Sequence, residues 1–97
     1  MNLEELYASD DQSYLILEYM NDLCRDSKWD ECNSFIKSVE IDRLDSCGIR
    51  SICVSTHHAK RYLPYYKELY RKCYDRMLVL RKDNADRLLW FILDDLK

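Results

Sequence analysis

The chain contains only one glycine, Gly48, and one proline, Pro64, in 97 residues. Sheets and β-hairpins need turn residues of these types at regular intervals, whereas helices can be joined by short polar links. Apolar residues recur every three or four positions along most of the chain, which is the spacing of one face of a helix. The sequence therefore predicts an all-α fold, a small antiparallel bundle of four to five helices built as two stacked helical hairpins, in a single domain over residues 1–97.

Helix boundaries follow from the apolar spacing and from the polar residues that begin helices. Ser9 and Gln12 have the spacing of a capping box, so a long helix is expected from about residue 10 to residue 26. The link to the next helix should be only one or two residues, and residues 56–62 should be irregular. The other expected segments are a leading turn over 3–8, a helix capped by Ser27, a shorter helix capped by Asp45 or Ser46, a helix over about 64–82 with Pro64 in its first turn, and a last helix capped by Asp83.

Each expected helix carries apolar residues that would face the core, and Gly48 should weaken its helix by up to about 1 kcal/mol relative to alanine. The predicted core comprises Tyr14, Leu17, Met20, Leu23 and Cys24, with Leu15, Ile16 and Tyr19 as a second flank; Trp29, Cys32, Phe35, Ile36 and Val39; Ile49, Ile52 and Cys53; Tyr66, Leu69, Tyr70, Cys73, Met77 and Leu80; and Leu88, Leu89, Ile92 and Leu96.

The chain has five cysteines at irregular spacing, namely Cys24, Cys32, Cys47, Cys53 and Cys73. An odd number of cysteines, beside an acidic N-terminus that lacks the features of a signal peptide, is a poor basis for a disulfide framework. Most of them are therefore expected to be small buried apolar residues. No apolar stretch is long enough to cross a membrane. Together these features predict a cytoplasmic protein.

Charge is divided unevenly between the two halves of the chain. Residues 1–48 hold twelve acidic and four basic residues, whereas residues 49–97 hold eleven basic and six acidic residues. The formal net charge of −3 conceals this difference. An acidic and a basic face would offer surfaces to a partner protein or to a second copy of the chain. The sequence leaves open whether the two halves neutralise each other within one molecule.

The segment from Lys60 to Lys82 is basic and rich in tyrosine. Basic side chains contact phosphates and aromatic rings stack on nucleobases, so this segment favours nucleic-acid binding as an alternative function. Against that alternative, Tyr66 and Tyr70 lie on the expected core face, acidic residues four positions away can pair with the bases, and the pI is near 5.3. The residues predicted to contact a partner are Lys60, Arg61, Tyr65, Lys67, Arg71, Lys72, Tyr74 and Trp90.

The geometry of this segment would separate the two functions. If its exposed tyrosines and bases share one face, nucleic-acid binding is favoured. If bases and acids alternate around the surface, nucleic-acid binding is not favoured.

No arrangement of catalytic or cofactor-binding residues is recognisable in the sequence. The chain has no Gly-rich phosphate loop and none of the common hydrolase or metalloprotease motifs. His57 and His58 follow Cys47 and Cys53, but this spacing fits no standard zinc site. We therefore expect no metal, no cofactor and no enzymatic activity.

Several positions follow a shared pattern: an aromatic start to the second helix, a Val-x-hydrophobic-Asp-x-Leu turn, a short helix ending in Thr, a Leu-Pro-aromatic step and a Leu-Leu pair. The matching residues are Trp29, Phe35, Val39, Ile41, Asp42, Arg43, Leu44, Ile52, Thr56, Arg61, Leu63, Pro64, Tyr65, Leu88 and Leu89. In this pattern, over about residues 14–89, the chain resembles a group of small, uncharacterised helical proteins of phage and bacterial genomes. Tyr65 stands where that group often has tryptophan. The resemblance implies an all-helical phage or prophage accessory protein of the host cytoplasm, and it assigns no activity.

These observations predict a small, non-enzymatic interaction protein that binds another protein or a second copy of itself. The candidate surfaces are the basic helix, the acidic first hairpin and the aromatic C-terminal helix around Trp90. Nucleic-acid binding through residues 60–82 is the alternative.

Overall fold

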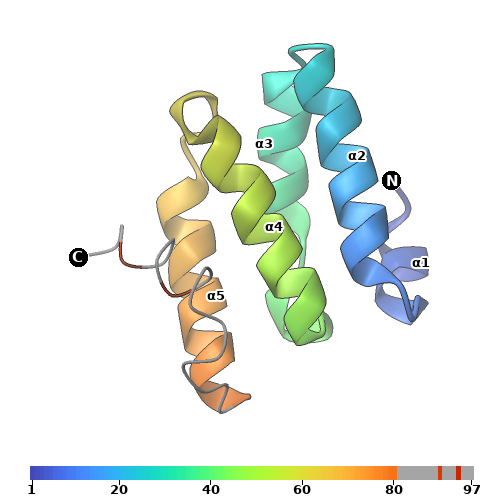
Figure 1. Ribbon diagram of the computed structural model, residues 1–97, viewed down its shortest axis with the longest axis vertical. Helices are drawn as coiled ribbons and strands as arrows, with labels where there is room; N and C mark the ends of the chain where they lie inside the picture. The colour runs from blue at the N-terminus through green and yellow to red at the C-terminus, as the bar shows by residue number, and fades with distance from the viewer. Residues whose placement is uncertain (81–89, 91–93, 95–97) are drawn as a thin grey trace.

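The computed structural model of the chain describes residues 1–80 together with Trp90 and Asp94. These residues form a small all-α bundle, as predicted (Figure 1). The elements are α1 (Leu3–Ala8), α2 (Gln12–Arg25), α3 (Trp29–Ser38), the 3₁₀ turn η1 (Ile41–Arg43), α4 (Ser46–Ala59), the 3₁₀ turn η2 (Lys60–Tyr62) and α5 (Tyr66–Val79). No described helix combines the length and the apolar composition that a membrane crossing requires.

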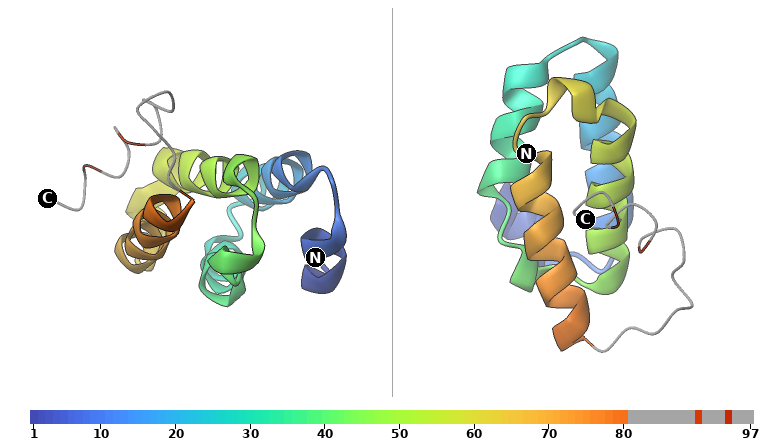
Figure 2. Two further views of the ribbon diagram at one scale, coloured as in Figure 1. Left: turned by 90° about the horizontal axis from the view of Figure 1, so that it is seen from below. Right: turned by 90° about the vertical axis from the view of Figure 1, so that its left-hand side faces the viewer.

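The four longer helices form two antiparallel hairpins, α2–α3 and α4–α5, that lie side by side. Seen from below, α2 and α4 make one layer, and α1, α3 and α5 make the other (Figure 2). The hairpins meet mainly where α2 packs on α4, and α3 adds contacts with α5. The acidic α1 and α2 therefore lie on the opposite side of the bundle from the basic α5 (Figure 1).

Most predicted core positions are buried, including Met20, Phe35, Ile52 and Leu69. The prediction for α2 was wrong in one respect: Tyr14 is 58% exposed, whereas Ile16 is fully buried. Because α2 has apolar residues on two flanks, the sequence did not determine which flank is buried. In the structure α2 contacts both α3 and α4, and the flank that carries Ile16 is buried. Three cysteines are buried, Cys24 is half-buried and Cys47 is exposed, and all five are free thiols.

The link between α2 and α3 differs from the prediction. It has three residues, and Ser27 adopts a left-handed backbone with a φ of 55° instead of capping α3. The amide of Ser27 donates to the carbonyl of Cys24 (3.1 Å), and the amide of Lys28 donates to the carbonyl of Leu23 (2.9 Å). These two bonds make a Schellman motif, which ends α2 and reverses the chain.

The expected capping box at Ser9 and Gln12 does not form. The hydroxyl of Ser9 accepts a hydrogen bond from the amide of Asp11 (2.9 Å). Gln12 is buried, and its amide nitrogen donates to the carbonyls of Tyr7 and Arg43, both at 3.3 Å. Its side-chain oxygen accepts from the amide of Asp45 at 2.8 Å. Gln12 thus joins the end of α1, the end of η1 and the start of α4.

Gly48 allows α2 and α4 to approach each other closely. A β-carbon at this position would lie 2.8 Å from the side-chain oxygen of Gln12, which is held in place by its hydrogen bonds. One turn further along α4, the hydroxyls of Ser51 and Ser13 lie 2.5 Å apart. Glycine at position 48 lowers the helix propensity of α4, as expected, but only glycine permits this close contact between α2 and α4.

Two boundaries in the second half differ from the predictions. Asp45 caps α4 as expected, by accepting from the amide of Gly48 (2.7 Å), but α4 is as long as α2 and continues to Ala59. Residues 56–62 are thus helical rather than irregular, because Thr56 and Ala59 are buried on the inner face of α4. Pro64 lies just before α5, which begins at Tyr66. The predicted last helix, with Asp83 as its cap, falls outside the described residues apart from Trp90 and Asp94.

Candidate interaction groove

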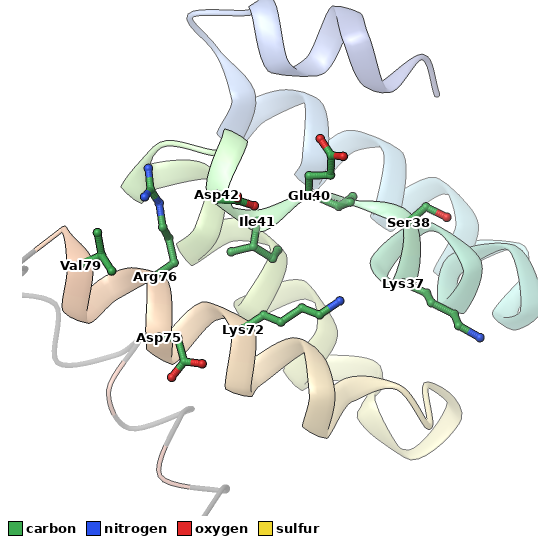
Figure 3. A pocket seen from close by; sticks show the side chains of 10 residues that line it. Lys37, Ser38, Glu40, Ile41, Asp42, Lys72, Asp75, Arg76 and Val79 are labelled. Carbon is green, nitrogen blue, oxygen red and sulfur yellow. The ribbon is translucent and has the colours of Figure 1, made fainter.

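An open groove of about 540 Å³ lies between the segment that leads into η1 and one flank of α5. Figure 3 shows this groove from close by. Its lining residues are Lys37, Ser38, Val39, Glu40, Ile41, Asp42, Lys72, Asp75, Arg76 and Val79. The groove thus joins segments that lie thirty or more positions apart in the sequence.

The chain between α3 and η1 forms one wall of the groove because its apolar residues alternate with charged ones. Val39 and Ile41 are buried in the core, whereas Glu40 and Asp42 are exposed. Val39 and Glu40 have extended backbones and Ile41 begins η1, and this path buries Val39 and Ile41 while it leaves the carboxylates of Glu40 and Asp42 exposed. The amide of Glu40 also donates to the hydroxyl of Tyr7 (2.9 Å), which fixes the segment to α1.

Arg43, at the end of η1, contacts residues that position the same wall. Its guanidinium lies 4.2 Å from the centre of the Tyr7 ring and pairs with Glu4 (3.0 Å) and Glu40 (3.4 Å). The hydrogen bond and the charge of Arg43 lower the pKa of Glu4, and the same hydrogen bond raises the pKa of Arg43. These contacts are exposed, so they orient the wall more than they stabilise the fold.

The opposite wall is the flank of α5 that carries Lys72, Arg76 and Val79. The ammonium of Lys72 donates to the hydroxyl of Tyr65 at 2.6 Å, seven residues earlier on the same flank. The Nε atom of Arg76 is buried and has no hydrogen-bond partner among the described residues. Val79 is 68% exposed at the end of α5. This wall therefore offers one unpaired donor atom and one apolar side chain.

The acidic and basic halves of the chain meet at this groove. One wall carries Glu40 and Asp42 from the acidic half of the chain, together with the basic Lys37. The other wall carries Lys72 and Arg76 from the basic half, together with the acidic Asp75. The lining residues carry three basic and three acidic groups. The groove thus combines neighbouring charges of opposite sign with the exposed apolar side chain of Val79.

The residues that the sequence nominated for partner contact lie in four separate places, one of which is η2. Lys72 lines the groove and Tyr65 is bonded to it. Lys67 and Arg71 are exposed on the outer side of α5. Tyr74 packs edge-on against Trp90, with ring centres 5.4 Å apart.

Tyr65 and Tyr74 do not share a face. Tyr65 directly precedes α5 and Tyr74 lies nine positions later, which is two and a half turns, so they lie on opposite flanks. Two exposed acidic residues, Glu68 and Asp75 of the groove wall, lie among the bases of α5. Bases and acids therefore alternate around α5, which does not favour nucleic-acid binding.

Lys60 and Arg61 lie in η2, at the end of the bundle where the two hairpins touch. The Tyr62 ring stacks on Trp29 of α3, with centres 4.4 Å apart and planes 11° apart. The guanidinium of Arg61 lies 5.5 Å from the centre of the Tyr62 ring, and the ammonium of Lys60 lies 5.8 Å from that of Tyr66. These bases accompany aromatic contacts that join the hairpins.

Sequence reasoning did not single out most of the groove residues, including Lys37, Glu40, Arg76 and Val79. One signal was present: the order Val39-Glu40-Ile41-Asp42 alternates apolar and charged residues, which is typical of a half-buried extended segment. Nothing local to the sequence indicated that α5 would lie opposite this segment.

The histidines and cysteines do not form a shared site in the described part of the chain. The rings of His57 and His58 lie 6.2 Å apart; His57 is half-buried and His58 is exposed. Residues 1–80, with Trp90 and Asp94, contain no cluster of three or more histidine, cysteine or acidic side chains that could hold a metal ion.

Comparison with known proteins adds no relative to these observations: no protein-family model, curated protein or solved structure matches this chain.

Proposed function

We propose that this chain is a small, non-enzymatic interaction protein that binds a protein partner or a second copy of itself through the groove between η1 and α5. Its resemblance to phage-type helical proteins supports an accessory role in a host cytoplasm. The observation that carries the proposal is the groove itself, which is lined by charges of both signs and by the exposed apolar side chain of Val79. Protein interfaces typically combine apolar and charged side chains.

The mixed charge of the groove favours a protein over a polyanion. A nucleic acid presents one sign of charge and would meet the carboxylates of Glu40, Asp42 and Asp75 as well as the bases. A protein segment can present both signs to the groove. The Nε–H of Arg76, which has no partner among the described residues, would donate a hydrogen bond to a carboxylate or carbonyl oxygen of such a segment.

Self-association is tested first, by light scattering of the purified chain at low and at high salt. A dimer that dissociates in salt supports binding of a second copy through charged groups. A monomer at both salt concentrations argues against self-association and leaves a different protein as the partner. The 260/280 nm absorbance ratio of the same sample reports nucleic acid carried through purification.

The groove is tested with Val79→Asp and Asp75→Lys, two exposed positions where substitution should leave the fold intact. Lys67→Glu, on the outer side of α5, is the matched control. We expect both groove variants to weaken binding of the partner or of the second copy by at least about tenfold, which corresponds to about 1.4 kcal/mol, while the control binds like the wild type. Equal effects of all three variants would remove the groove from the proposal.

Nucleic-acid binding remains the alternative proposal because α5 and η2 carry an excess of bases. Fluorescence anisotropy with single strands and duplexes tests it, and the predicted signature is an affinity that falls steeply with salt. Weakening of that binding by Lys67→Glu and Arg71→Glu, but not by Val79→Asp, would favour this alternative over the protein partner.

A further inference from the structure

A second groove, of about 420 Å³, lies between the start of α1 and one side of α3. The two helices are neighbours in one layer of the bundle, and α2 lies in the other layer (Figure 2). This groove is part of the acidic first half of the chain, where the sequence predicted a contact surface. We propose that the α1–α3 groove binds a lysine side chain from a basic segment of a partner protein.

Three apolar or aromatic side chains of the α1–α3 groove come from three different helices: Leu3 from α1, Tyr19 from α2 and Phe35 from α3. The Tyr19 and Phe35 rings pack edge to face, with centres 4.9 Å apart and planes 70° apart. Phe35 is buried, whereas Leu3 and Tyr19 are half-buried, so part of their apolar surface still faces solvent. The methylene groups of a lysine side chain can cover such surface, and its ammonium is attracted to the face of an aromatic ring.

Asp30 and Glu31 give the α1–α3 groove its charge. Both are exposed in the first turn of α3, and the lining side chains include no base. Neither carboxylate forms a salt bridge with another of the described residues, whereas the carboxylate of Glu4 is paired with Arg43. The start of a helix carries about half a positive charge, which two carboxylates outweigh. A cation that enters this groove therefore meets negative charge that no salt bridge to a described residue compensates.

The length of the groove favours a protein segment over a small amine. Ser34 and Ser38 follow Asp30 at intervals of four residues, which places the three side chains on one face of α3. The groove therefore extends along about 12 Å of the helix. A single lysine side chain occupies only part of that length, and the adjoining residues of a segment can cover the rest. Nucleic acid does not fit, because the two carboxylates would repel its phosphates.

The α1–α3 groove is separate from the groove between η1 and α5. The two share only Ser38 among their lining residues. The groove between η1 and α5 carries equal numbers of acidic and basic residues, whereas the charged side chains of the α1–α3 groove are all acidic. The inference therefore does not rest on binding at the groove between η1 and α5, and variants of the two grooves can be compared in one assay.

Fluorescence anisotropy tests the proposal with a dye-labelled helical peptide of leucine and lysine, mixed with the full-length protein. We expect binding that weakens as salt is raised, because the groove and the peptide carry opposite charges. A second peptide has diaminopropionate in place of lysine, which keeps the charge but removes three methylene groups from each side chain. We expect it to bind at least about tenfold more weakly, since those methylene groups would no longer be buried against Leu3 and Tyr19.

Two substitutions in the α1–α3 groove and two outside it make the result specific. Glu31→Lys reverses a charge of the groove, and Ser34→Phe fills it without a change of charge; both positions are exposed, so the fold should tolerate them. We expect each to weaken peptide binding by at least about tenfold. Glu18→Lys, at an exposed position of α2 outside the groove, makes the same change of charge as Glu31→Lys. Glu18→Lys, and Val79→Asp in the other groove, should bind the peptide like the wild type.

Any of four outcomes would overturn the proposal. The first is that the wild type does not bind the lysine peptide. The second is an equal loss of binding in Glu18→Lys and Glu31→Lys, which would mean that the peptide responds to net charge alone. The third is a loss in Val79→Asp as large as that in Ser34→Phe, which would place the peptide in the groove between η1 and α5. The fourth is displacement of the peptide by an equal concentration of spermine, which would make a free polyamine the ligand.

Discussion

The contact between α2 and α4 and the groove between η1 and α5 show two ways in which helices of one small bundle face each other. Where α2 meets α4, the small residues Gly48 and Ser51 let the helices approach closely, and the buried Gln12 finds a partner for each side-chain polar atom. Where α5 lies beside η1, charged side chains line an open groove and the Nε of Arg76 has no hydrogen-bond partner among the described residues. The first contact is closely packed, whereas the second is open to solvent.

The largest effect is expected from Gln12→Ala. Removing this side chain leaves the amide of Asp45 and the carbonyls of Tyr7 and Arg43 without their partner. We expect the free energy of unfolding to fall by about 2–3 kcal/mol, measured by urea denaturation. Asn21→Ala, at an exposed position of the same helix, should change it by less than about 0.5 kcal/mol. Equal effects of the two substitutions would contradict the role of Gln12.

Gly48→Ala should come second, because the added methyl group meets the side-chain oxygen of Gln12 at 2.8 Å. We expect a loss of about 1 kcal/mol, although alanine is the better helix former by a similar amount. In a Gln12→Ala background the same substitution should instead be neutral or stabilising. A double-mutant cycle measures the coupling between positions 12 and 48. Additive effects would show that the Gln12 side chain is not what disfavours alanine at position 48.

Tyr65→Phe should have a smaller effect, because its hydrogen bond with Lys72 is exposed. We expect less than about 1 kcal/mol of destabilisation by urea denaturation. The same change frees the ammonium of Lys72 beside the groove, so binding of a partner should change more than stability does. Isothermal titration with the partner, or light scattering for a second copy, measures the binding. A larger change in stability than in binding would show that Tyr65 contributes to the stability of the fold rather than to binding.

The smallest effect concerns the ion pair of Glu4 and Arg43, which lies on the surface. The hydrogen bond and charge of Arg43 lower the pKa of Glu4 below its ordinary value of 4.5. The pair therefore contributes its stability above that value and loses it as the pH falls through the lower, folded-state pKa. Titration of the Glu4 carboxyl by NMR should show the lowered pKa in the wild type and a return toward 4.5 in Arg43→Gln. An unchanged pKa in the variant would mean that another group lowers it.

Within residues 1–80, sequence patterns were sufficient to predict the helices and most of the core. The spacing of Cys32, Phe35 and Ile36 identified the inner face of α3, and that of Leu69, Cys73 and Met77 identified the inner face of α5. These predictions depend on local periodicity, and the residues they identified are buried in the structure. The end of α4 was not predicted, since Thr56 looks polar in sequence but lies in the core.

Contacts between residues that are far apart in the sequence could not be predicted from local sequence patterns. The prediction of a capping box at Ser9 and Gln12 was wrong, because Gln12 instead bonds residues 31 and 33 positions away. The groove likewise combines a segment around Ile41 with a flank of α5. Only the tertiary arrangement brings these parts together, so neither contact leaves a signature at one place in the sequence.

The left-handed Ser27 bears on the order in which the chain folds. The hydrogen bonds around it close loops of only a few residues, whereas the contacts of Gln12 join residue 12 to residues 43 and 45. Short loops lose less chain entropy on closure, so the α2–α3 hairpin should form early and the junction of α1, η1 and α4 should form late. Substitutions at Gln12 should then act mainly by accelerating unfolding, with little effect on the folding rate.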